Sequence, residues 1–199
     1  MANFSVSEFT SNIAKKGLAS PNKFRVRFTM PSNIGTPGEP FNLMVENVDL
    51  AGRNVNSAIN IEYGVRREVA YNAPAYDPLN VTFLCSQDMA EKEKLEQWNN
   101  HIVKVNSGFD VEYYDNYIGS VKVEVLDKQS LKTKYWVEYL EAYPKVINSI
   151  PFNHSTTNQT VRVTASFVYS YYITEDTKRY TSRGVNALEG PEATIDQWK

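Results

Sequence analysis

Residues 160–173 read TVRVTASFVYSYYI, with an apolar or aromatic side chain at every second position. This period of two over fourteen residues predicts one long β-strand with a continuous apolar face. The positions on that face are Val161, Val163, Ala165, Phe167, Tyr169 and Tyr171. The opposite face begins polar and then gains Val168 and Tyr172. Because an uncovered apolar flank is typical of an interface, we predict a contact between subunits here, with cover by the N-terminal or C-terminal segment as the alternative.

The rest of the chain predicts a mainly β fold. Further runs with strand-like composition cover residues 23–29, 41–48, 58–63, 65–71, 79–85, 109–113, 121–126 and 135–143. Gly64, between two of these runs, indicates a hairpin or a bulge. Many short strands with turn signals and one inserted helix predict an antiparallel β-sandwich or barrel with a flanking α-helix.

Two helices are expected. A short N-terminal helix opens with the capping-box pattern Ser5-Val-Ser-Glu8 and closes at Gly17. A longer helix is expected to begin at Ser86, because Leu95, Trp98, Ile102 and Val105 follow at helical spacing. The run 91–94, Glu-Lys-Glu-Lys, is expected to face water.

Length and composition limit the organisation of the chain. The 199 residues suit one β-rich domain over residues 1–173, followed by a polar extension over residues 174–199. A net charge of −2 lacks the basic excess that grips nucleic acid. The single cysteine, Cys85, excludes an intrachain disulfide and is expected to be a buried small hydrophobe. No apolar run is long enough for a signal peptide or a membrane span, so no membrane anchoring is expected.

The histidines give little material for catalysis. His101 and His154 belong to no zinc-binding pattern, and no phosphate-binding glycine loop occurs in the chain. A triad of Ser155, His154 and Asp176 would lack the nucleophile elbow that such a triad needs. We therefore expect no enzyme activity from these groups.

Three carboxylates, Asp110, Glu112 and Asp115, lie close together in the sequence. They could bind calcium or act as an acid and base pair, but the glycine and closing glutamate of an EF-hand are missing. A solvated hairpin is the favoured interpretation, so no metal and no cofactor are expected.

Three segments taken in order resemble the tail tube proteins of contractile-tailed, T4-like bacteriophages. The first is 41–57, FNLMVENVDLAGRNVNS, which is similar to the family's Leu-Pro-Gly-Arg loop with Ala51 in place of the proline. The second, residues 79–98, is a Val-x-Phe strand that leads into a helix with a Leu-x-x-Trp motif. The third, residues 113–172, follows the family's order of strand, strand, Tyr-Pro link and terminal β-run.

The resemblance implies a virion protein, assembled in the host cytoplasm, that forms stacked hexameric rings inside a tail sheath and above a baseplate. DNA would pass through the channel without specific binding. Contacts between rings are expected at Phe9, Ile13, Leu50, Gly52, Arg53 and Asn54. Lateral contacts within a ring are expected at Val168, Tyr169, Tyr171 and Tyr172.

Several alternatives remain open on sequence grounds. Within the same fold, the chain could be the baseplate protein that initiates the tube, or the tube of a phage-derived injection particle. From a different class, a small-molecule-binding β-barrel of lipocalin type would also show alternating strands and one helix. An enzyme built on Asp110, Glu112 and Asp115 is the least favoured alternative.

Overall fold

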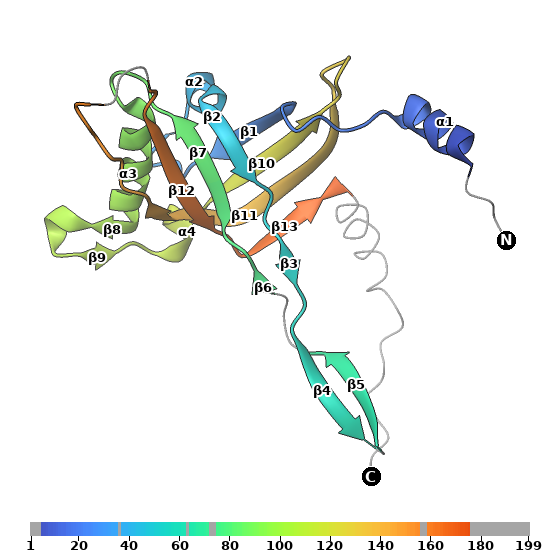
Figure 1. Ribbon diagram of the computed structural model, residues 1–199. Helices are drawn as coiled ribbons and strands as arrows, with labels where there is room; N and C mark the ends of the chain where they lie inside the picture. The colour runs from blue at the N-terminus through green and yellow to red at the C-terminus, as the bar shows by residue number, and fades with distance from the viewer. Residues whose placement is uncertain (1–4, 36, 63, 72–74, 156–158, 176–199) are drawn as a thin grey trace, which may run out of the picture. The chain divides into compact units, whose positions relative to one another are not determined.

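A computed structural model describes residues 5–35, 37–62, 64–71, 75–155 and 159–175 (Figure 1). The chain forms two compact units. Unit 1 comprises residues 1–25, 123–137 and 174–199, and unit 2 comprises residues 26–122 and 138–173. Most of the predicted extension, residues 176–199, lies outside the described residues, and so does Asp176 of the hypothetical triad.

The largest element is a seven-stranded sheet with the order β1-β10-β11-β12-β7-β2, in which β13 also pairs with β11 (Figure 1). Its strands are β1 (Phe24–Thr29), β2 (Val45–Asp49), β7 (Leu79–Leu84), β10 (Gly119–Leu126), β11 (Thr133–Ile147), β12 (Arg162–Val168) and β13 (Tyr171–Thr174). β12 runs antiparallel to both β11 and β7, and β7 runs antiparallel to β2. The prediction of a mainly β, antiparallel fold with flanking helices is confirmed.

One face of this sheet forms the core of unit 2. Along β7 and β12 every second side chain is buried: Leu79, Val81, Phe83, Val163, Ala165 and Phe167 are at most 1% exposed. The ring of Phe28 on β1 lies 5.5 Å from that of Phe83 and 5.6 Å from that of Phe167. Each of the buried leucine, valine and phenylalanine side chains contributes about 1.5–3 kcal/mol by leaving water. The period of two in the sequence therefore identifies the core face correctly.

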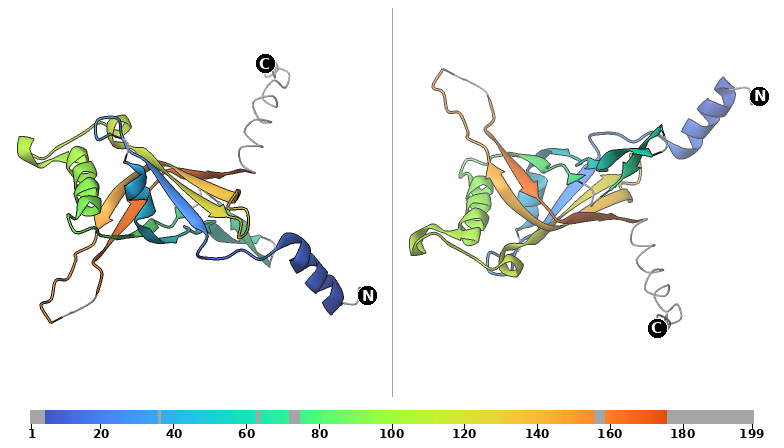
Figure 2. Two further views of the ribbon diagram at one scale, coloured as in Figure 1. Left: turned by 90° about the horizontal axis from the view of Figure 1, so that it is seen from above. Right: turned by 90° about the horizontal axis from the view of Figure 1, so that it is seen from below.

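The helix α3 (Ala90–Ile102) lies beside the sheet (Figure 2). Trp98 makes the contact between the two. Leu95 and Trp98 are fully buried, and the Trp98 ring centroid lies 5.9 Å from that of Phe167. The Trp98 indole Nε1–H donates a hydrogen bond of 2.8 Å to the carbonyl oxygen of Tyr117. This interaction holds the chain that follows α3 against the helix.

The predicted start of this helix at Ser86 is wrong by four residues. Met89 has a left-handed backbone with φ of 55°, and the helix begins after it. The backbone N–H and hydroxyl of Ser86 both donate to the Glu91 carboxylate, at 2.8 and 2.7 Å. Glu91 is only 5% exposed, so the expectation that all of residues 91–94 face water is also wrong.

The remaining elements are short. The helices are α1 (Val6–Lys16), α2 (Glu39–Leu43), the 3-10 turn η1 (Val105–Ser107) and α4 (Tyr114–Tyr117). The strands are β3 (Arg53–Asn54), β4 (Ser57–Glu62), β5 (Val65–Ala70), β6 (Ala75–Tyr76), β8 (Val103–Lys104) and β9 (Asp110–Val111). Among the described residues, no helix has both the length and the hydropathy required to cross a bilayer.

Several local predictions need correction. The N-terminal helix forms and ends at Gly17, but Ser5 makes no side-chain cap. Residues 41–43 are helical instead of extended, because Pro40 fits the first turn of α2. Cys85 is half-buried instead of buried, and this partial desolvation raises the pKa of its thiol.

The single long strand predicted for residues 160–173 is interrupted. β12 ends at Val168 and β13 starts at Tyr171, while the Ser170 N–H donates to the Leu140 carbonyl oxygen at 3.1 Å. The break shifts the phase of the alternation, so Tyr169 is 7% exposed whereas Tyr171 is 42% exposed. The longest strand is instead β11, with 15 residues.

Candidate assembly surfaces

A long antiparallel ribbon extends from the edge of the large sheet in unit 2. It begins where β2 pairs with β7 and continues where β3 pairs with β6, in the register Arg53↔Tyr76 and Asn54↔Ala75. It ends in the β4–β5 hairpin, in the register from Ser57↔Ala70 to Glu62↔Val65. Residues 53–76 are called the β-arm below (Figure 1). The arm thus consists of two short ladders, β3–β6 and β4–β5, that follow the β2–β7 ladder along the chain.

The end of the β-arm is exposed on both faces. Ile59, Ile61 and Val69 are 55%, 67% and 49% exposed. Gly64 has φ of 78° at the tight turn between β4 and β5, a conformation that glycine adopts readily. The hairpin prediction at Gly64 is confirmed. A two-stranded hairpin is marginally stable alone in water, so cover from outside the chain would stabilise this one.

The segment expected to join rings, Leu50 to Asn54, lies at the base of the β-arm. Leu50 is 48% exposed, and Arg53 and Asn54 form β3. The backbone N–H of Ala51 donates to the Tyr139 hydroxyl at 3.1 Å. Gly52 lies so close to Asp77 that a Cβ there would be 2.7 Å from its Oδ2. The segment is a strand connection and not a plain turn, and its inter-ring role stays a prediction.

The other residues expected to join rings lie on α1, in unit 1. Phe9 is 52% exposed and Ile13 is half-buried. Their predicted inter-ring role also stays a prediction.

The residues expected to make lateral contacts lie around a cluster of four tyrosines in unit 2. The Tyr169 ring centroid lies 4.7 Å from that of Tyr139 and 5.6 Å from that of Tyr76. Tyr172 joins the same cluster, with its ring 5.8 Å from that of Tyr139. Tyr169 is 7% exposed and therefore offers little surface to a neighbour. The same burial raises the pKa of its hydroxyl.

Val168 and Tyr171 present more surface than Tyr169. Val168 is half-buried and pairs with Tyr143 of β11. Tyr171 is 42% exposed at the start of β13. The assignment of lateral contacts to Val168, Tyr169, Tyr171 and Tyr172 stays a prediction.

A second exposed apolar surface, which the sequence did not single out, follows α3. It is called the hairpin surface below and consists of Val105, Phe109, Val111 and Tyr113. These side chains are 53%, 69%, 68% and 82% exposed. Residues 109–113 were predicted as a strand, but only Asp110 and Val111 pair, with β8. Phe109, Val111 and Tyr113 alternate as the residues of a buried strand face do, so the sequence alone does not distinguish this surface from a core face.

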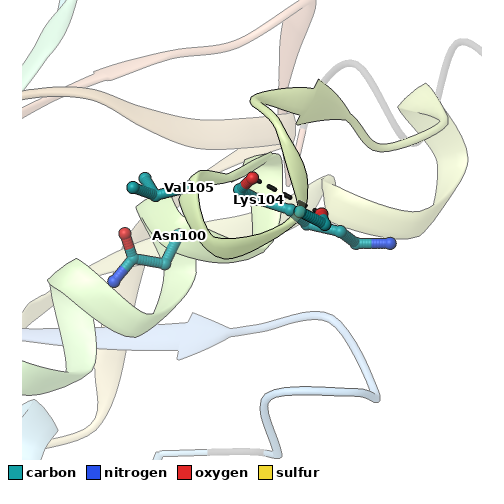
Figure 3. A pocket seen from close by; sticks show the side chains of 4 residues that line it. Asn100, Lys104 and Val105 are labelled. Atoms are coloured by element: carbon teal, nitrogen blue, oxygen red, sulfur yellow. Dashed lines mark hydrogen bonds between the residues drawn. The ribbon is translucent and has the colours of Figure 1, made fainter.

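The backbone beneath the hairpin surface is tightly held. Phe109 has φ of 65°, which is uncommon for a bulky residue, and its N–H donates to the Lys104 carbonyl oxygen at 3.1 Å. A hollow of about 440 Å³ beside the hairpin is lined by Asn100, Lys104, Val105 and Ser107 (Figure 3). The lining consists of one amide, one lysine side chain, one valine and one hydroxyl, and these groups do not form a catalytic set.

Of the three carboxylates that lie close together in the sequence, Glu112 forms an ion pair with Lys104. Glu112 and the Lys104 ammonium lie 2.5 Å apart, and the Asn116 amide donates to Glu112 at 3.0 Å. These interactions, with that of Lys104 the largest, lower the pKa of Glu112 to about 2. Among the described residues, no group of three or more His, Cys, Asp or Glu side chains is arranged to hold a metal ion.

The histidines occupy polar surroundings. His101 Nε2 lies 3.2 Å from the Asn116 carbonyl oxygen. His154 is exposed, and the neighbouring Ser155 hydroxyl donates to Asn153 Oδ1 at 2.8 Å. Ser155 is therefore engaged in a local turn.

These features define a class of protein, an antiparallel β-sheet protein with a projecting β-arm and exposed apolar side chains. The chain belongs to the phage tail tube protein family, whose model matches residues 19–175. The resemblance seen in the sequence is confirmed. No curated protein sequence matches the chain.

Solved structures share the fold at low sequence identity. A chain of the anti-feeding prophage baseplate has a TM-score of 0.60 and 14% identity, over 82% of this chain and 99% of that chain. A chain of the sheath-tube complex of an extracellular contractile injection system has a TM-score of 0.57 and 14% identity, over 83% of this chain and 97% of that chain. A chain of the anti-feeding prophage cap has a TM-score of 0.56 and 11% identity, over 80% of this chain and 92% of that chain.

Proposed function

We propose that this chain is the structural subunit of a tail tube. Copies close into hexameric rings, the rings stack into a hollow cylinder, and the phage genome leaves through the channel. The cylinder is assembled in the host cytoplasm, stands on a baseplate in the virion and is driven by the surrounding sheath. The chain itself performs no chemistry, and its work is mechanical.

The observation that carries this proposal is the uncovered β-arm. Its distal hairpin exposes Ile59, Ile61 and Val69 and pairs only with itself among the described residues. An exposed ribbon with apolar side chains is an aggregation hazard unless a specific partner covers it. In a tube that partner is a neighbouring copy, so assembly stabilises a part of the chain that folding leaves unprotected.

Strand edges support the same proposal. Within the described part of the chain, β2 pairs only with β7, and β13 pairs only with β11. Closing a ring of subunits satisfies such edges without leaving a free end. Tyr171 at the start of β13 and the half-buried Val168 at the end of β12 would provide lateral contacts, and Tyr172 would support them from the tyrosine cluster.

The charge of the subunit suits a channel for DNA. A net charge of −2 gives no basic surplus to hold phosphates. A wall that binds the genome tightly would slow its passage. The proposed lumen therefore conducts DNA without specific binding.

A baseplate tube initiator is the second candidate. The specific observation in its favour is the likeness to a chain of the anti-feeding prophage baseplate. An initiator would form rings that do not extend, whereas a tube subunit polymerises by itself at sufficient concentration. Negative-stain microscopy of the purified protein separates the two.

The test compares the wild type with Val168→Asp. A charge at the half-buried Val168 should leave a folded, soluble subunit but prevent ring closure, because it places a carboxylate in an apolar contact. Gln129→Asp is the control, since it adds the same charge in the exposed turn before β11. Far-ultraviolet circular dichroism checks folding, and light scattering after size exclusion gives the mass. A wild type that stays monomeric at all concentrations would refute the proposal.

A further inference from the structure

The hairpin surface is large for an isolated apolar patch. An aromatic side chain offers about 150–250 Å² of surface, so Phe109 at 69% and Tyr113 at 82% exposure present about 300 Å² together. Val105 and Val111 extend this area. A patch of this size lies at the level where monomers usually have an interaction site.

The hairpin surface is also preformed. The Lys104–Glu112 ion pair links β8 to the residue after β9, and the Glu112 N–H donates to the Ile102 carbonyl oxygen at 2.9 Å. Asn116 of α4 bonds to the same carboxylate. Because these contacts already order the backbone, binding of a partner would not have to offset the free energy cost of ordering it.

One face of the β-arm has matching character. In an antiparallel ladder, directly paired residues lie on the same face, so Ile61 lies beside its partner Arg66, and Ile59 beside Glu68. The Glu68 carboxylate accepts a hydrogen bond from the Ser57 hydroxyl. The face thus presents two exposed isoleucines, Arg66 near the tip and Glu68, whose carboxylate is engaged by Ser57.

Charge disfavours contact between two hairpin surfaces. Residues 103–117 contain three carboxylates, Asp110, Glu112 and Asp115, and one lysine, Lys104. Two such surfaces brought together would repel each other, since each carries an excess of negative charge. The β4–β5 hairpin balances two arginines with two glutamates, and its isoleucine face carries one of each, Arg66 and Glu68, so that face has no excess of negative charge. Arg66 can therefore meet Asp110 or Asp115 while Ile59 and Ile61 meet the aromatic side chains.

We propose that the isoleucine face of the β-arm of one copy docks on the hairpin surface of a second copy. This inference rests on the proposed tube function and names the two surfaces that join. The contact is heterologous, because it uses two different patches, and each subunit keeps one free arm and one free hairpin surface after binding. Such a contact propagates from copy to copy, as the growth of a tube requires.

The test uses one variant for each surface. Ile61→Asp disables the arm, and Phe109→Asp disables the hairpin surface. Both side chains are more than half exposed, so both variants should fold, and aspartate tolerates the positive φ at position 109 better than phenylalanine. Phe152→Asp is the matched control, because Phe152 is 74% exposed and lies in neither surface. We expect each disabled variant to stop tube growth and the control to grow tubes as the wild type does.

Mixing the two disabled variants decides the question. Phe109→Asp keeps a working arm and Ile61→Asp keeps a working hairpin surface, so an equimolar mixture should undergo one round of association. Size exclusion and microscopy should then show paired subunits or paired rings and no tubes. If the wild type forms tubes but Phe109→Asp does so equally well, or if the mixture does not associate, the inference is wrong while the proposed function stands. A wild type that never assembles would overturn both.

Discussion

Gly119→Ala tests how closely β10 approaches β1 and α3. A Cβ at residue 119 would lie 2.2 Å from the Thr29 carbonyl oxygen and 2.9 and 3.0 Å from two carbons of the Trp98 ring. Ordinary contact of a Cβ begins at 3.4 Å, so the distance to the backbone oxygen is 1.2 Å too short. Neither a strand backbone nor a fully buried indole can rotate away as an exposed side-chain end can.

The expected cost follows from this geometry. Neighbouring strands lie about 4.8 Å apart, and separating β1 from β10 by about 1 Å would break the backbone hydrogen bonds beside Gly119. Overpacking costs about 1–3 kcal/mol, and each lost hydrogen bond costs about 1 kcal/mol more. We therefore expect a loss of about 3 kcal/mol in the free energy of unfolding. For a chain of this length, that loss lowers Tm by about 6–12 °C.

The assay is urea unfolding followed by tryptophan fluorescence, at a concentration where the protein is monomeric, since assembly would add apparent stability. Gly52→Ala is the matched control. Its Cβ would meet only the Asp77 carboxylate, at 2.7 Å, and that flexible side-chain end can move. We expect the control to lose less than about 1 kcal/mol. If Gly119→Ala lost no more than Gly52→Ala, the close approach of Gly119 to Thr29 and Trp98 would be refuted.

Three further substitutions test polar groups. Among the described residues the buried Tyr169 hydroxyl has no hydrogen-bond partner, so Tyr169→Phe should stabilise the fold by about 1 kcal/mol. Tyr139→Phe should destabilise the fold by about 1 kcal/mol, because the Ala51 N–H would lose its acceptor. If Tyr169→Phe and Tyr139→Phe changed the free energy of unfolding in urea equally, this contrast would be contradicted. Lys104→Met should raise the pKa of Glu112 from about 2 toward 4.5, as measured by a carbon NMR titration of the carboxyl group. Because the pKa of Glu112 in the folded protein lies below its ordinary value, the ion pair stabilises the hairpin fully above pH 4.5. This stabilisation is lost as the pH falls through about 2. If Glu112 titrated in Lys104→Met as it does in the wild type, groups other than Lys104 would be the cause of the lowered pKa.

Much of the fold could be predicted from local sequence patterns. The alternation in residues 24–29, 79–84, 121–126 and 162–168 identified strands and their buried faces, because side chains point to opposite sides of a strand with a period of two. The helical spacing of Leu95 and Trp98 identified the face of α3 that packs on the sheet. The order of these segments also revealed the family.

The candidate surfaces were less accessible to sequence reasoning. The segment of Leu50 to Asn54 was identified, but its place at the base of the β-arm depends on three ladders that pair residues up to 38 positions apart, as in Val45↔Phe83. The hairpin surface was missed, since Phe109, Val111 and Tyr113 alternate as core residues do. Only the structure shows that no layer of the described chain covers them.

Local sequence patterns specify most of the strands and helices, their apolar faces and the family, because these depend on neighbours along the chain. Contacts between distant segments determine where a strand predicted from the alternation ends. The Leu140 carbonyl oxygen accepts a bond from Ser170 and breaks the last strand, so Tyr169 turns into the tyrosine cluster and Tyr171 turns outward. A hydrogen-bond partner distant in the sequence cannot be inferred from local periodicity, yet it decides which side chains remain available to another copy.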